Sequence, residues 1–280
     1  MKAKLTSCRL AFVSDLHIDH SPTWSSRDYL EACQALISQE DIDYFIIGGD
    51  ISNNWHTSLA FVEELDSSSP AAIYFIPGNH DYWQRPAPRT DTWSIHQIFR
   101  QHPQCLMGKA LQPLANWRIV GHPAWYNHAV HDERFSPEQI ERGRFKLATW
   151  QDKKFIDWDM TDREVSQAFS QEIWTDFQQA PSPNYIFVSH ILTIPEFTVP
   201  MPHPAFDFFN AFLATDDLNS LYQNFPIRYS IMGHVHIRYQ VYKNGTHFIA
   251  NSLGYPKEWR TDQLDQELRS ACFILDLNER

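Results

Sequence analysis

Polar side chains of types that bind metal ions follow five apolar runs of this chain. They are Asp15 and His17 after "FVS", Asp50 after "IIGG", Asn79, His80 and Asp81 after "FIPG", His190 after the second "FVS", and His234 and His236 within "GHVH". A lone histidine or a Gly-Asn pair at such a place is ordinary turn chemistry. Metal-binding side chains would not be expected to recur at five unrelated turns. Burying so many polar groups together without a partner would also be energetically costly. Bound cations would offset that cost, so the pattern predicts a metal site.

The donor atoms indicate which ions would bind. Apart from His80 and Asp81, the set consists of two aspartates, one asparagine and four histidines, which supply oxygen and nitrogen without a thiolate. This mixture suits Mn, Fe or Zn better than a calcium site or a closed structural zinc site. Seven ligands exceed the need of one four-coordinate ion with an open position. We therefore predict two divalent ions that share one bridging carboxylate.

Short and mostly apolar strands must position these residues. Strands are expected at 9–14, 44–49, 72–77, 117–121, 185–189 and 229–233, followed by a hairpin at 238–251 that turns at Asn244-Gly245 and a last strand at 272–277. In α/β folds, residues just beyond the strand ends line the ligand crevice. The polar side chains are therefore expected to meet at one edge of the sheets.

Helical patterns lie between the strands. Helices are expected at 28–39 and 54–66, after capping boxes that begin at Ser136 and Thr161, and at about 204–223. The stretch 122–183 separates two core strands and is long for a connection. We expect residues 1–280 to form a single domain, with 122–183 as a helical insertion over one end of the sheets.

Bulk properties exclude several classes of protein. The 280-residue chain has a net charge of -11 and no run of lysine or arginine, so binding of nucleic acid through bulk charge is disfavoured. No apolar run approaches the roughly 18 residues of a membrane span. The four cysteines are scattered without close pairs, which is typical of reduced thiols in a cytoplasmic protein.

In this order, the motifs "DLH", "GGD", "GNHD", "SH" and "GHVH" resemble those of the calcineurin-like metallophosphoesterase superfamily, over residues 15 to 236. The resemblance implies a four-layer α/β/β/α sandwich of two mixed sheets. It also implies that Asp50 bridges two ions. One ion would be held further by Asp15, His17 and His236, and the other by Asn79, His190 and His234. His80 would be the catalytic histidine, and Asp81 would orient it.

The implied reaction is hydrolysis of a small phosphodiester or phosphomonoester by a hydroxide that bridges the two ions. His80 would stabilise the developing charge and protonate the leaving group. The protein Ser/Thr phosphatase branch carries arginines beside "GD" and "GNH" that this chain lacks, so the bacterial phosphodiesterase and small-molecule phosphatase branches fit better. Asn53 could contact phosphate in place of an arginine, or it could cap a helix.

The insertion is expected to decide the substrate. Trp125 or Tyr126 could stack on a base or sugar, and Arg134 could bind a second phosphate, but packing of the helices is the favoured interpretation of the two aromatic residues. A small-molecule phosphoester is the expected partner. Two alternatives stay open: a metal-dependent nuclease, against which the acidic balance counts, and a non-catalytic scaffold such as the superfamily's retromer subunit, which would have lost ligands.

Overall fold

The computed structural model describes residues 6–84 and 90–279, and two mixed sheets form its centre. The first sheet has the strand order β11 (Phe273–Asn278), β1 (Ser7–Val13), β2 (Tyr44–Ile47) and β3 (Ala72–Phe75). The second has the order β4 (Arg118–His122), β7 (Tyr185–Ser189), β8 (Ile227–Met232), β10 (Thr246–Asn251) and β9 (Arg238–Lys243). Strands β11 and β9 run antiparallel to their neighbours, and the others are parallel.

The two sheets pack face to face. On β1, Leu10 and Phe12 belong to the same buried cluster as Ile186 of β7 and Ile231 of β8. Successive side chains of a strand point to opposite faces. The alternate residue, Ala11, accordingly packs in the cluster that contains the α1 and α2 side chains. Each sheet therefore has one face against the other sheet and one face toward helices.

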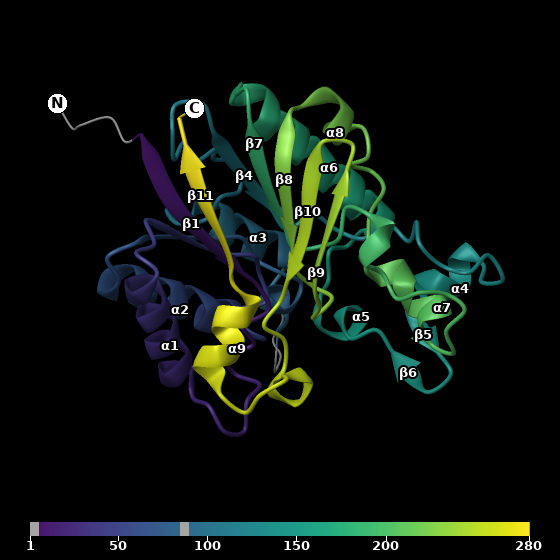
Figure 1. Cartoon of the computed structure of the whole chain (residues 1–280). Helices are drawn as coiled ribbons and strands as arrows, with labels where there is room; N and C mark the ends of the chain where they lie inside the picture. Colours follow the sequence, from purple (N-terminus) through teal and green to yellow (C-terminus); the bar gives the residue numbers. More distant parts are fainter. Residues whose placement is uncertain (1–5, 85–89, 280) are drawn as a thin grey trace.

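Helices cover the outer faces. Helices α1 (Ser26–Gln39), α2 (Trp55–Ser68) and α9 (Leu264–Ala271) lie together beside the first sheet (Figure 1). Helix α6 (Asp162–Gln179) covers the second sheet, where the ring of Phe177 contacts Tyr185 and Phe187 of β7. Helix α3 (Thr92–Gln101) precedes β4. The predicted α/β fold with two mixed sheets is thus confirmed.

The segment between β4 and α6 holds only short elements. They are α4 (Pro137–Glu141), β5 (Arg144–Phe145), β6 (Ala148–Thr149) and α5 (Asp152–Phe155). Together with α7 (Phe206–Phe209) they lie on the side of the molecule away from α1 and α2 (Figure 1). Helix α6 instead returns along the second sheet, so only the first part of the expected insertion stands apart from the sheets.

The long helix expected at 204–223 is wrong. The chain there forms α7, a 3-10 turn η3 (Asn210–Phe212) and α8 (Leu221–Asn224). Between them Ala214 bridges to Leu192, and the amide of Thr215 donates to the carbonyl of Leu192 at 2.9 Å. Pairing with this distant segment prevents a continuous helix. Helices α3 and α9 were not expected from the sequence.

Helices in the described ranges, 6–84 and 90–279, include none long and apolar enough to cross a membrane.

Candidate metal centre

Sharp turns at the strand ends bring the polar residues together. Five of them have a left-handed backbone, with φ of 57° at Asp15, 44° at His17, 53° at Asp50, 73° at His234 and 43° at His236. Residues other than glycine rarely adopt such angles, which cost roughly 1–3 kcal/mol each and cluster at functional sites. The surrounding fold holds this backbone and aims the five side chains at one place.

The first group consists of Asp15, His17 and His236. Their ligand-type atoms lie within 4.8 Å of one another. His17 Nε2 is 3.0 Å from His236 Nε2, which is 3.5 Å from Asp15 Oδ1. Two imidazole nitrogens this close need a shared proton or a shared cation between them. The geometry is that of three ligands facing one ion.

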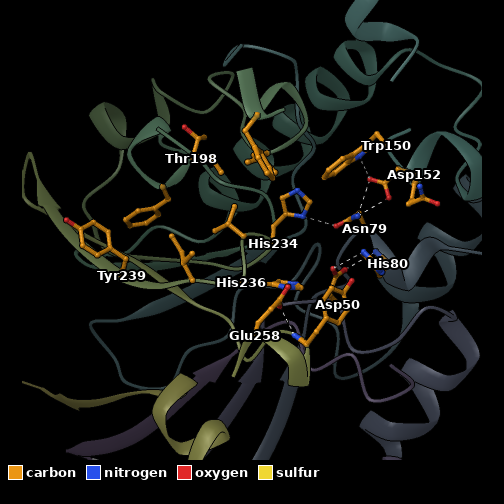
Figure 2. A pocket seen from close by; sticks show the side chains of 18 of the residues that line it. Asp50, Asn79, His80, Trp150, Asp152, Thr198, His234, His236, Tyr239 and Glu258 are labelled. Carbon is orange, nitrogen blue, oxygen red and sulfur yellow. Dashed lines mark hydrogen bonds and ion pairs between the residues drawn. The ribbon is translucent and has the colours of Figure 1, made fainter. Parts of the chain in front are cut away.

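The second group consists of Asn79, His190 and His234. Asn79 Oδ1 lies 3.0 Å from His190 Nε2 and 2.9 Å from His234 Nδ1. Asp50 stands between the two groups, since its Oδ1 is 3.4 Å from His190 Nε2 and its Oδ2 is 3.8 Å from His17 Nε2. A carboxylate in that position can contact two ions at once. Figure 2 shows Asp50 beside His236, with Asn79 and His234 next to it.

The far ring nitrogens of three histidines are already engaged. His190 Nδ1 lies 2.9 Å from the carbonyl of Gly48, and His234 Nε2 lies 2.9 Å from the carbonyl of Phe212. His236 Nδ1 lies 2.7 Å from Glu258 Oε2. Each acceptor holds the proton on that nitrogen and leaves the other nitrogen free to bind a metal. The donor set therefore fits divalent cations.

The charges of the site also call for cations. Asp15 and Asp50 are 0% and 1% exposed. Burial by itself raises the pKa of Asp15, but the neighbouring imidazoles hold it well below its usual range. Burial likewise lowers the pKa of His190, yet Asp50 raises it to about 9. Two buried carboxylates thus need positive charge next to them, which bound ions would supply.

Glycine allows the turns to approach one another. A Cβ on Gly78 would lie 2.2 Å from Asp50 Oδ1, and a Cβ on Gly233 would lie 2.7 Å from Asp15 Oδ2. No side chain fits in either place. The glycines of "GNHD" and "GHVH" are therefore required by the closeness of the two aspartates.

His80 lies beside the two groups and contributes no atom to the set around Asn79. Its Nε2 is 3.9 Å from Asp50 Oδ2, and its Nδ1 is 2.6 Å from Asn53 Oδ1. The ring stacks on Trp83 with centroids 3.6 Å apart. Asn53 is held in turn by Asp19, to which its side-chain amide donates at 3.3 Å. The ring is thus fixed on two sides, with Nε2 turned toward the metal ligands.

Comparison with known proteins agrees with these motifs. The sequence model of calcineurin-like phosphoesterases matches residues 8–238. The chain belongs to this family. It is therefore a metal-dependent phosphoesterase, whose family uses a dinuclear centre, and the grouped Asp and His residues could hold such metals. A search of curated proteins finds no match.

Solved structures share the fold of this calcineurin-like phosphoesterase. The phosphopantetheinyl hydrolase PptH of Mycobacterium tuberculosis has a TM-score of 0.71 at 18% identity, covering 96% of each chain. A dimetal phosphatase from Danio rerio has a TM-score of 0.52 at 12% identity, covering 87% of this chain and 86% of its own. At these identities the likeness concerns the fold alone.

Asp81 has a different environment from the one expected. It was expected to orient His80, but its carboxylate accepts hydrogen bonds from the backbone amides of Gly78 at 2.7 Å and of Asp50 at 2.8 Å. It also accepts from Ser58 Oγ at 2.5 Å. Asp81 joins the two turns that carry Asp50 and Asn79. The contact to the His80 ring comes from Asn53, while the helix cap is the next residue, Asn54.

Asp152 was missed by sequence reasoning. Asn79 Nδ2 donates to its two carboxylate oxygens at 2.9 and 3.1 Å. Trp83, Tyr126 and Trp150 donate to the same carboxylate at 2.6, 3.0 and 2.9 Å. Burial raises the pKa of Asp152 to about 6, although these hydrogen bonds lower it. One buried carboxylate of the insertion therefore holds the side-chain amide of Asn79 in place.

The structure does not place three of the expected substrate contacts, Trp125, Tyr126 and Arg134, at the site. Trp125 and Tyr126 are 1% and 0% exposed. The indole of Trp125 donates to Asp162 at 3.0 Å, and Arg134 donates to Asp207 at 2.6 Å. Neither aromatic residue has an open face for a ligand, and Arg134 does not line the cavity beside Asp50 and Asn79. The stacking and second-phosphate roles are corrected accordingly, and the packing alternative holds for Trp125 and Tyr126.

A cavity of about 670 Å³ opens beside the metal centre. Five residues of the candidate site line one end, namely Asp50, Asn79, His80, His234 and His236. Trp150 and Asp152 lie next to them, and Thr198 and Tyr239 lie toward the far end (Figure 2). Trp125, Tyr126 and Arg134 do not contribute to this lining.

Proposed function

We propose that the chain hydrolyses small phosphodiesters or phosphomonoesters at two divalent ions, with His80 as the group that transfers the proton. The position of Asp50 between the two ligand groups, with His80 Nε2 3.9 Å from it, carries this proposal. Asp15, His17 and His236 would hold one ion, and Asn79, His190 and His234 the other. Asp50 would contact both.

Two ions of Mn, Fe or Zn bound there would activate a water molecule and bind the phosphate oxygens. The chain's own residues would supply the proton for the leaving group and hold the group that donates it. The amide oxygen of Asn53 accepts a hydrogen bond from His80 Nδ1–H. In the doubly protonated imidazolium, His80 Nε2 therefore carries the proton that passes to the oxygen of the leaving group, and the ring is left neutral. Stacking on Trp83 keeps that nitrogen over the site.

Two alternative functions fit less well. A nuclease needs a basic surface, whereas the net charge is -11 and the described residues that line the cavity include no lysine or arginine. A scaffold would not need a complete ligand set together with a fixed His80.

The four cysteines are free thiols, which supports the cytoplasmic location expected from the sequence.

The test begins with chain stripped of metal and reloaded with Mn²⁺, Fe²⁺ or Zn²⁺. We expect about two ions per chain and turnover of bis-p-nitrophenyl phosphate or p-nitrophenyl phosphate that a chelator abolishes. The Asp50→Asn variant should lose this turnover, and the matched exposed control Asp262→Asn should keep it. A chain that binds two ions but cleaves neither ester would contradict the proposal. Faster cleavage of an oligonucleotide would favour the nuclease.

A further inference from the structure

The cavity continues away from the metal ligands as an apolar arm. We use this name for the side chains of Phe197, Val199, Leu213, Val235, Ile237 and Tyr239, which line it. The arm begins directly at the metal centre, because Val235 and Ile237 alternate in the chain with His234 and His236. A molecule whose phosphate lies at the metal centre can therefore place its remaining atoms next to these side chains.

The walls of the arm are built into the fold. Phe197 and Leu213 are 3% and 5% exposed and pack in one cluster with Met232 of β8 and Phe248 of β10. The ring of Tyr239 meets that of Phe197 edge to face, with centroids 5.9 Å apart. The apolar lining is thus preformed and does not need to be assembled by a ligand.

The charges along the arm exclude a second anionic group. Glu196 lines the cavity next to Phe197 in the chain, and Lys243 Nζ already pairs with its carboxylate at 2.5 Å. Glu258, near the ions, is paired with His236. Among the described lining residues there is no lysine or arginine to bind another phosphate. An anion placed in the arm would lose its hydration without gaining a partner.

We propose that the apolar arm binds the uncharged, elongated organic group of a phosphoester whose phosphate lies at the metal centre. The substrate class is then an ester of phosphate with an alkyl-like or other neutral chain, and nucleotides that carry further phosphates are excluded. This inference rests on the proposed function. The volume, about 670 Å³ for the whole cavity, lies within the range of small-molecule sites.

Binding of non-hydrolysable alkylphosphonates tests the inference without relying on turnover. Methyl-, butyl- and hexylphosphonate are titrated into the Mn²⁺-loaded chain by calorimetry and used as inhibitors of bis-p-nitrophenyl phosphate hydrolysis. Each methylene that enters an apolar site improves binding by about two- to fourfold. We expect hexylphosphonate to bind at least tenfold more tightly than methylphosphonate, and a bisphosphonate of similar length to gain nothing.

Variants of the arm provide the second measurement. Ile237 and Tyr239 are 36% and 57% exposed, so replacing both by serine removes apolar wall without opening the core. We expect the hexyl-to-methyl affinity ratio of Ile237→Ser/Tyr239→Ser to fall at least threefold. Tyr242 lies on β9, as Tyr239 does, is 77% exposed and does not line the cavity. Tyr242→Ser is therefore the matched control and should keep the ratio of the unaltered chain.

The outcomes separate this inference from the proposed function. Equal affinity for all three phosphonates in a chain that hydrolyses bis-p-nitrophenyl phosphate would overturn the inference and leave the function standing. A chain-length preference that survives in Ile237→Ser/Tyr239→Ser would also overturn it, because the chain would then bind elsewhere. Absence of hydrolysis in a chain that still prefers hexylphosphonate would remove the proposed function while keeping the apolar site.

Discussion

The side-chain amide of Asn79 donates to both carboxylate oxygens of Asp152, a residue 73 positions further along the chain. This contact turns the amide oxygen of Asn79 toward His190 and His234, at 3.0 and 2.9 Å. The carboxylate is 2% exposed and also accepts from Trp150. A buried group in the insertion thus decides which atom of Asn79 faces the metal site.

Asp152→Asn should weaken binding of one of the two ions. The substituted amide would turn its nitrogen toward groups that are themselves hydrogen-bond donors. The side-chain amide of Asn79 would then lose the acceptor that fixes its orientation. Loss of such a supporting contact lowers metal affinity by about 10- to 100-fold. Metal titration monitored by calorimetry measures the effect, and the exposed Asp262→Asn is the control. Two unchanged binding steps in Asp152→Asn would show that Asn79 does not depend on this contact.

Asp50→Asn should remove the stabilisation that metal gives to the fold. Ligand at 100 times its dissociation constant stabilises a folded protein by about 2.7 kcal/mol. Because Asp50 faces both groups of ligands, its replacement should reduce this gain for both ions and abolish turnover. Thermal unfolding with and without Mn²⁺ measures the gain. An undiminished metal-induced rise in melting temperature would mean that Asp50 does not bridge.

Local patterns sufficed to predict the strands of the two central sheets and the polar residues that follow them, but not the two-residue strands β5 and β6. The hairpin is an example, because Asn244 and Gly245 have φ of 51° and 84° in a tight turn that joins β9 and β10. Apolar runs such as 185–189 are buried along their whole length and form β7. Each such pattern is complete within a few residues, so the chain's own sequence contains the signal.

Contacts made through tertiary structure could not be predicted in this way. Asp152 and Glu258 follow no motif, and each meets its partner, Asn79 or His236, only after folding. Trp125 sits in a polar, aromatic stretch that suggests a ligand site, yet the fold buries it. The sequence signal that could have indicated Asp152 is its place directly after Trp150 and Gln151, because an acidic residue beside an indole can accept its hydrogen bond.

His96 links the stability of the fold to pH. The ring is buried, and burial together with the charge of Arg100 lowers the pKa of His96 to about 3. An unfolded histidine titrates near pH ~6.5, so between these values the unfolded chain binds a proton that the folded chain does not. The contribution of the neutral His96 ring to the free energy of unfolding is present above pH ~6.5 and is lost as the pH falls. We expect this contribution to decrease by about 2 kcal/mol from pH 8 to pH 5.

Urea unfolding of metal-free chain at the two pH values measures this contribution. Two charged groups face the His96 ring: Glu172 Oε2 lies 3.7 Å from Nε2, and Arg100 pairs with that carboxylate. His96→Gln lacks the titrating group. The difference in free energy of unfolding between the unaltered chain and this variant should therefore be about 2 kcal/mol smaller at pH 5 than at pH 8. The exposed His56→Gln should follow the unaltered chain. A gap that does not change with pH would contradict the prediction.

Asp81→Asn should act on stability more than on the chemical step. An asparagine has one acceptor oxygen, whereas Asp81 accepts from the amides of Gly78, Asp50 and Ser52 with both oxygens. Leaving buried donors unpaired costs about 1–3 kcal/mol. Urea unfolding without metal measures the loss against Asp262→Asn. Undiminished stability combined with a leaving-group-dependent loss of rate would restore Asp81 as the residue that orients His80.

His80 and Asn53 should affect the leaving group. If His80 Nε2 transfers a proton to the departing oxygen, His80→Asn should keep both ions while kcat falls roughly 10²–10⁴-fold for an alkyl ester. The loss should be much smaller for p-nitrophenolate, which hardly needs a proton. Asn53→Ala should show a milder form of the same pattern, because it removes only the acceptor 2.6 Å from His80 Nδ1.

The comparison needs both leaving groups and the metal content of every variant, with the exposed His56→Asn as the matched control. An equal loss on both leaving groups would leave His80 with a phosphate-binding role alone. Loss of an ion in His80→Asn would make the residue a ligand, which its 3.9 Å distance from Asp50 Oδ2 does not require. If Asn53→Ala keeps full activity while His80→Asn does not, stacking on Trp83 is what holds the ring, since the two contacts fix it from different sides.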